Sequence, residues 1–82
     1  MTELQEKVRA YLCKEARLAP TQITANTPLI SSSLIDSFLI VGLVAFLEDE
    51  FRVKIPDDFV TPEHLDSLVQ IEALVEQRRS KT

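Results

Sequence analysis

The chain has 82 residues, of which 45% are hydrophobic and 27% charged, and its formal net charge is −4. This length and composition predict one small folded domain over residues 1–82 rather than a disordered segment. The negative charge argues against nucleic acid as the partner, because phosphate backbones are bound through basic surfaces.

The sequence also disfavours metal sites, disulfides and membrane segments. Cys13 and His64 are the only residues of their kinds, so neither an internal disulfide nor a zinc ligand set can be assembled. No apolar run reaches the roughly 18 residues of a transmembrane helix, and the polar start of the chain does not have the pattern of a signal peptide. We therefore expect a cytoplasmic protein that does not insert into membranes and holds no metal.

The first helix is predicted to run from Glu3 to Arg17. Thr2 and Gln5 have the spacing of a capping box, in which the side chains of both residues bind backbone N–H groups at the helix start. A stripe of side chains with helical spacing predicts the buried face: Leu4, Val8, Tyr11 and Leu12. Pro20 prevents the helix from continuing.

A long connection follows, over residues 18–35. Pro20, Pro28 and the serines at 31–33 break regular structure there. Apolar residues are nevertheless spread through it: Ile23, Leu29, Ile30, Leu34 and Ile35. A solvated linker would not need them, so we expect a loop that its own side chains hold against the helices.

The second helix is predicted from Asp36 to Phe51, with Asp36 as its N-cap. Its core stripe is expected to be Phe38, Val41, Val44, Leu47 and Phe51. Leu39 and Ile40 widen the apolar surface beyond one stripe; we expect Leu39 to be exposed, while exposure and burial are equally favoured for Ile40. Gly42 lies mid-helix, where glycine costs about 1 kcal/mol relative to alanine. Either this cost is tolerated or a partner or loop packs closely there.

Two further helices are predicted after Pro56. Thr61-Pro62-Glu63 indicates a short helix from Pro62 to Asp66, which contains His64. Ser67 and Gln70 form a second capping box at the start of the last helix. That helix should bury Leu68, Ile71, Leu74 and Val75 and place cations at its C-terminal end: Arg78, Arg79 and Lys81. The fold class is therefore all-α, a bundle of three main helices and one short helix.

Ser37 is the residue best placed for chemistry, because the start of a helix favours anions. A catalytic nucleophile would need an adjacent base, and the chain offers only His64 and no G-x-S-x-G motif around Ser37. The simplest alternative is that Asp36 caps the helix and Ser37 is merely its first residue. The remaining hypothesis is attachment of a phosphate-containing group by a separate enzyme, which requires no base and no catalytic residue in this chain.

Residues 34–38, with Asp36-Ser37 at their centre, are followed in register by the segments 43–51, 55–58 and 61–68. Together these segments resemble the family of acyl and peptidyl carrier proteins, of the freestanding type, over most of the chain. The resemblance implies a four-helix carrier fold in which Ser37 bears 4′-phosphopantetheine, attached from coenzyme A by a phosphopantetheinyl transferase. It also implies a monomeric carrier that is not an enzyme. The carrier presents an acyl or aminoacyl thioester, delivered by a loading enzyme, to a downstream synthase or transferase.

The sequence departs from the family pattern in two places. Carrier proteins often have a glycine shortly before the Asp-Ser pair, where this chain has Ser33 and Leu34, which should stiffen the approach to the helix. Carriers of fatty-acid synthesis usually have acidic residues in the first two helical turns, where this chain is apolar. We therefore expect partner recognition through a mixed set of apolar and acidic residues: Leu39, Ile40, Glu48 and Asp49.

The cargo and the pathway stay open at this point. The apolar helix start favours a specialised acyl carrier, or an aminoacyl or peptidyl carrier of a secondary or cell-envelope pathway, over a standard fatty-acid carrier. A helical adaptor that carries nothing and a small hydrolase are weaker alternatives. A cleft for an acyl chain would be lined by Phe38, Val41, Val44, Leu47, Phe59, Leu65, Leu68 and Ile71, and the sequence does not decide whether cargo enters it.

Overall fold

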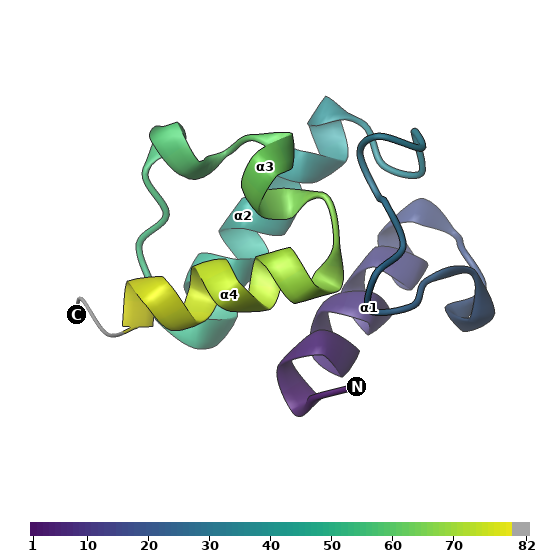
Figure 1. Cartoon of the computed structure of the whole chain (residues 1–82), viewed down its shortest axis with the longest axis horizontal. Helices are drawn as coiled ribbons and strands as arrows, with labels where there is room; N and C mark the ends of the chain where they lie inside the picture. The colour runs from purple at the N-terminus through teal and green to yellow at the C-terminus, as the bar shows by residue number, and fades with distance from the viewer. Residues whose placement is uncertain (80–82) are drawn as a thin grey trace.

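The computed structural model describes residues 1–79, which form four α-helices and two short 3-10 turns without any strand (Figure 1). The elements in chain order are α1 (Glu3–Ala16), a turn at Pro20–Gln22, α2 (Ser37–Phe51), a turn at Asp57–Phe59, α3 (Pro62–Leu65) and α4 (Leu68–Arg79). This confirms the predicted all-α class, and the helix bounds agree with the predicted ones to within a residue. Arg78 and Arg79 end α4 as expected, and Lys81 lies outside the described residues.

The helices enclose one core. α1 packs against α2 and α4, and α3 packs against α4; in Figure 1 α4 runs in front of α2. The long loop contributes to this core, as predicted. Its fully or almost fully buried side chains are Ile23, Leu29 and Ile35. No helix within residues 1–79 is long and apolar enough to cross a membrane.

The two predicted capping boxes are only half formed. Thr2 Oγ1 accepts the N–H of Gln5 at 3.2 Å, but the Gln5 side-chain amide donates to Glu72 Oε1 on α4 at 2.7 Å instead of returning to the cap. In the second box, the Gln70 side-chain oxygen accepts the Ser67 hydroxyl at 3.1 Å rather than the Ser67 N–H, and its amide donates to the backbone oxygen of Glu63 at 3.0 Å. The hydroxyl caps mark the helix starts correctly, while the two glutamines connect different helices.

The buried face of α2 differs from the predicted one. Leu43 and Leu47 are fully buried, whereas Phe38 is 87% exposed and Val41 70% exposed. The predicted stripe began with steps of three residues, and each such step turns the face by about 60° because a helix has about 3.6 residues per turn. A stripe that begins at Phe38 therefore starts on the solvent side and reaches the core only at Leu47. Its two other members lie half-buried at the edge of the core: Val44 and Phe51.

The exposed apolar residues beside Ser37 also differ from the predicted ones. Leu39 and Ile40 are partly buried and pack against the core, so the expectation that Leu39 is exposed is wrong. Phe38 and Val41 form the exposed apolar surface instead. The reason is that α2 directs its Leu43 side into the core, which leaves the side with Phe38 and Val41 facing solvent.

Gly42 allows α1 to approach α2 closely. A Cβ atom at Gly42 would lie 2.7 Å from the hydroxyl of Tyr11, which is too close for a van der Waals contact. The Tyr11 ring is held there by stacking on Phe46, with centroids 4.4 Å apart and an interplanar angle of 19°. Among the described residues, the side chain that packs on Gly42 is thus Tyr11 of α1 and not a loop residue.

Gly42→Ala is expected to give no net gain in stability. Alanine improves helix propensity by about 1 kcal/mol, and displacement of the Tyr11 hydroxyl offsets this gain. In a Tyr11→Phe background the hydroxyl is absent, so the same substitution should raise the free energy of unfolding by up to about 1 kcal/mol. Urea unfolding of the four proteins measures the coupling, and equal effects of Gly42→Ala in both backgrounds would contradict this packing.

Candidate functional site

Ser37 is the first residue of α2, directly after its N-cap. The Asp36 carboxylate accepts the N–H of Leu39 at 2.9 Å, as predicted for an N-cap. The Ser37 side chain is exposed, and its hydroxyl has no hydrogen-bond partner within residues 1–79. The N–H groups of Ser37 and Phe38 belong to the first turn, where no intrahelical acceptor exists. An exposed hydroxyl therefore lies at the positive end of a 15-residue helix.

The other serines in the described part of the chain lie in different surroundings. Ser31 donates its hydroxyl to Asp66 at 2.5 Å, and Ser32 donates to the backbone oxygen of Pro28. Ser67 is buried at the start of α4. Ser33 is exposed, but it lies in a turn with φ of 64°, in the left-handed region that favours glycine. Ser37 alone among these serines combines an exposed, unbonded hydroxyl with the start of a long helix.

His64 is not placed to act as a base for Ser37. It lies on α3, where its ring contacts the ring of Phe59 edge-on at 5.1 Å. A serine nucleophile would need its base within hydrogen-bond reach. Within residues 1–79 no hydrogen bond joins His64 to Ser37, so the geometry gives no support to a nucleophilic role.

The outer face of α2 continues from Ser37 as an apolar stripe. Phe38, Val41 and Ala45 recur at spacings of three and four residues, so they share the solvent-facing side. Asp49 is exposed one turn further along, whereas Glu48 accepts the N–H of Ile55 at 2.8 Å and so holds the segment after α2. The face is therefore apolar beside Ser37 and acidic at its far end.

The comparison with known proteins identifies the family to which the chain belongs. The family defined by the phosphopantetheine attachment site matches residues 6–75, which include Ser37 and all of α2. The chain belongs to this family of phosphopantetheine-binding carrier proteins. Members of the family are carriers and not enzymes, and their prosthetic group is covalently bound 4′-phosphopantetheine.

Two curated relatives cover most of the carrier. The acyl carrier protein of Amoebophilus asiaticus (strain 5a2) is 30% identical over 78 residues, which is 95% of this chain and 95% of that protein. The acyl carrier protein of Zymomonas mobilis subsp. mobilis (strain ATCC 31821 / ZM4 / CP4) is 30% identical over 60 residues, which is 73% of this chain and 77% of that protein.

The surroundings of Ser37 in the carrier suit this prosthetic group. A phosphodiester on the hydroxyl would lie beside the N–H groups of Ser37 and Phe38, which lack intrahelical acceptors. The nearby Asp36 carboxylate is engaged with Leu39. Because the Ser37 side chain is exposed, a long arm can extend from it without displacing any residue of the core.

The eight residues of the predicted acyl cleft do not share one opening in the carrier. Four of them are fully buried core residues: Leu47, Leu65, Leu68 and Ile71. Phe59 and Val44 are partly buried against that core, and Phe38 projects into solvent. A shallow apolar hollow lies instead between α2 and the segment before α3, lined by Val41, Val44, Asp57 and Val60.

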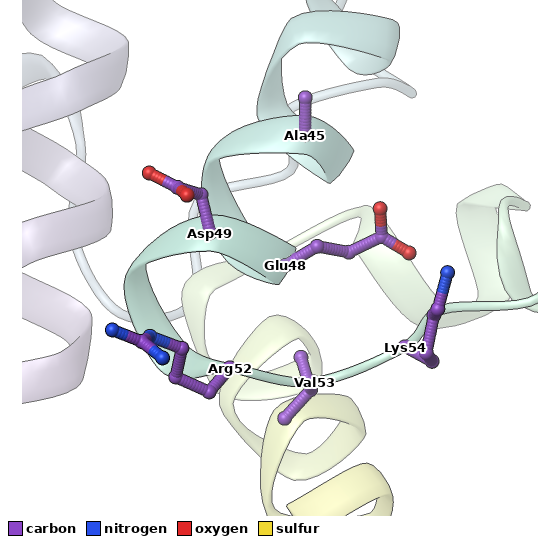
Figure 2. A pocket seen from close by; sticks show the side chains of 6 residues that line it. All are labelled: Ala45, Glu48, Asp49, Arg52, Val53 and Lys54. Carbon is purple, nitrogen blue, oxygen red and sulfur yellow. The ribbon is translucent and has the colours of Figure 1, made fainter.

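A second hollow lies at the other end of α2. Figure 2 shows Ala45, Glu48 and Asp49 on the helix and Arg52, Val53 and Lys54 on the segment that follows it. Its nearest residue to Ser37, Ala45, lies eight residues away, about 12 Å along the helix axis. This hollow is open and lined by charges of both signs, so we assign it to the far end of the outer face and not to the attachment site.

Sequence reasoning missed one residue of this region, Asp66. Its carboxylate accepts the N–H groups of Ile30 and Ser31 at 2.7 and 2.9 Å. The hydroxyl of Ser31 and the backbone N–H groups of this loop lower the pKa of Asp66 below its ordinary value. The stabilisation is therefore complete above the ordinary pKa of about 3.9 and is lost as pH falls through the lowered one. No local pattern announces this contact, because its partners are 35 and 36 residues away in the sequence.

Proposed function

We propose that this protein is an acyl carrier protein whose Ser37 hydroxyl bears 4′-phosphopantetheine. A phosphopantetheinyl transferase installs the group from coenzyme A. The Ser37 Oγ–P bond forms, the pyrophosphate bond of coenzyme A breaks, adenosine 3′,5′-bisphosphate leaves, and the transferase takes the hydroxyl proton. The thiol of the bound group then holds an acyl cargo as a thioester, and the domain presents that cargo to its partner enzymes.

One observation carries the proposal: Ser37 offers an exposed, unbonded hydroxyl at the start of α2, inside the segment that matches the family. The names of both relatives, acyl carrier protein, support acyl groups as the cargo class. The apolar hollow beside Val41, Val44 and Val60 supports it further, because moving hydrocarbon out of water lowers the free energy. Val41 lies four residues from Ser37, about 6 Å along the helix, within reach of the first carbons of a cargo.

Partner enzymes are proposed to bind the outer face of α2. Phe38 and Val41 provide the apolar contact next to the attachment point, and Asp49 provides an exposed charge about 16 Å from Phe38 along the axis. A partner that fits would have an apolar socket near its active site and a basic group further away. Leu39 and Ile40 support this face from beneath rather than touching the partner.

The function is tested by incubating the wild-type protein with coenzyme A and a broad-specificity phosphopantetheinyl transferase. The intact mass should rise by one phosphopantetheine. Incubation with acyl-coenzyme A should add the acylated group, and neutral hydroxylamine should then remove the acyl part, as it does from a thioester. An unchanged mass, in a reaction that modifies a control carrier protein, would overturn the proposal.

Phe38→Ala is expected to lower kcat/KM for transferase modification by about fivefold or more, because aromatic side chains at interface centres carry over about 1 kcal/mol of binding. Val41→Ala should lower it less. Val69→Ala is the matched control, since Val69 is also exposed, at 44%, but lies on α4. An equal loss for Val69→Ala and Val41→Ala, or none for Phe38→Ala, would show that the transferase does not read this face.

A further inference from the structure

Asp66, between α3 and α4, binds three consecutive residues of the long loop. Its Oδ1 accepts the N–H groups of Ile30 and Ser31, and its Oδ2 accepts the Ser31 hydroxyl, at 2.7, 2.9 and 2.5 Å. Its backbone oxygen accepts the N–H of Leu29 at 2.6 Å. Hydrogen bonds to an ionised carboxylate are about twice as strong as those between neutral groups. One residue thus makes four contacts with one short stretch of loop.

Further backbone hydrogen bonds connect residues 29 and 30 to the residues that precede Ser37. The N–H of Ile35 donates to the backbone oxygen of Leu29 at 3.1 Å, and the N–H of Ser33 donates to that of Ile30 at 3.0 Å. Leu29 and Ile35 are buried in the core. Residues 29–35 therefore form a closed loop whose two ends are bonded to each other, and Asp36 follows without any intervening residue.

The remainder of the long loop is held by other contacts. The N–H of Val69 donates to the backbone oxygen of Ala25 at 3.1 Å, and Ile23 is buried. Loss of the Asp66 carboxylate would therefore free the loop at Ile30 and Ser31, while Leu29 stays bonded to the backbone oxygen of residue 66 and the part of the loop that precedes it stays in place. The residues affected belong to the closed loop 29–35, which ends directly before Asp36, the N-cap of α2.

We infer that Asp66 is a positioning residue for the modification of Ser37: it holds the loop at residues 29–31 against the α3–α4 junction and so fixes the approach to the attachment serine. This inference rests on the proposed attachment of phosphopantetheine to Ser37. Asp66 makes no hydrogen bond to Ser37, and its carboxylate acts through Ile30 and Ser31 of the closed loop.

The test uses Asp66→Ala and Asp66→Asn in the full chain, with Asp58→Asn as the control. Asp58 is exposed and has no hydrogen-bond partner within residues 1–79, so its substitution makes the same charge change without freeing the loop. Asparagine keeps one acceptor oxygen at position 66 and should give an intermediate result. Ser31→Ala removes only the hydroxyl contact and serves as a second variant if Asp66→Ala does not fold.

Two readouts are measured at a temperature at which every compared variant is fully folded. Hydrogen exchange of the Ile30 and Ser31 amides should be at least about tenfold faster in Asp66→Ala. The kcat/KM for transferase modification of Ser37 should be unchanged in Asp58→Asn and severalfold lower in Asp66→Ala. Asp66→Asn and Ser31→Ala should give intermediate values. Global destabilisation alone would not change kcat/KM under these conditions.

The inference is overturned if the loop amides exchange faster while kcat/KM stays unchanged, because Asp66 would then be structural only. It is also overturned if the exchange of Ile30 and Ser31 does not respond to either substitution. Failure of the proposed function is distinguishable, since the wild-type protein itself would then remain unmodified while the exchange result would still stand.

Discussion

A Ser37→Ala variant is expected to take up no phosphopantetheine under conditions that modify the wild-type protein completely. The substitution removes the hydroxyl oxygen that forms the bond to phosphorus and leaves the rest of the site in place. Because this side chain is exposed and unbonded, the free energy of unfolding should change by no more than about 0.5 kcal/mol. Intact-mass measurement and urea unfolding check the two parts of this prediction.

Ser33→Ala is the matched control for that variant. Ser33 is also exposed and lies four residues before Ser37, but in a turn rather than at a helix start. The Ser33 variant should be modified as fully as the wild type. Uptake of phosphopantetheine by Ser37→Ala, or its loss in Ser33→Ala, would assign the attachment to the loop instead.

The largest effect on stability is expected at the buried face of α2. Leu43 is fully buried, so Leu43→Ala should lower the free energy of unfolding by about 2–5 kcal/mol through lost burial and a cavity. A domain of this size has about 4–12 kcal/mol in total, so the variant should be close to unfolding. Val41→Ala, two residues away and 70% exposed, should change stability by no more than about 0.5 kcal/mol.

Urea unfolding of the two variants decides how α2 faces the core. The stripe predicted from the sequence contained Val41 and left out Leu43, and would give the opposite order of effects. A larger loss for Val41→Ala than for Leu43→Ala would therefore contradict the orientation of α2 in the structure.

The helix starts could be predicted because their signals are local. Thr2, Asp36 and Ser67 each accept an N–H from the residue three positions later, and this spacing is visible in the sequence. Apolar residues within the long loop correctly predicted that the loop contributes to the core. Ser37 could be proposed for the same reason, since its position depends on the cap that precedes it.

The face of α2 could not be predicted, because from Phe38 to Leu47 every side chain is apolar and Gly42 has none. Amphipathic patterns locate the core only where polar residues mark the outside. The packing of α1 and of the loop selects the side with Leu43, and that choice depends on tertiary structure. It determines which apolar residues can meet a partner: Phe38 and Val41 instead of Leu39 and Ile40.

Contacts between residues distant in the chain also could not be predicted from the sequence. The capping boxes predicted that Gln5 and Gln70 turn back to their own helix starts. Gln5 bonds Glu72 instead, and Gln70 returns to the Ser67 hydroxyl but also bonds the backbone of Glu63. Asp66 has no motif around it, and its role appears only when the fold brings residues 29–31 beside it. Local chemistry was thus predictable, and its connection to the rest of the fold was not.

The most direct measurement of the central claim is tandem mass spectrometry of the wild-type protein after incubation with coenzyme A and a transferase. Trypsin should release residues 18–52 as one peptide, since no Lys or Arg lies between Arg17 and Arg52. That peptide contains Ser37 and the serines at 31–33, so its fragment ions must place the added mass. We predict one phosphopantetheine on Ser37 and none on residues 31–33. Its absence, while a control carrier protein is modified, or its presence on another serine would contradict the account.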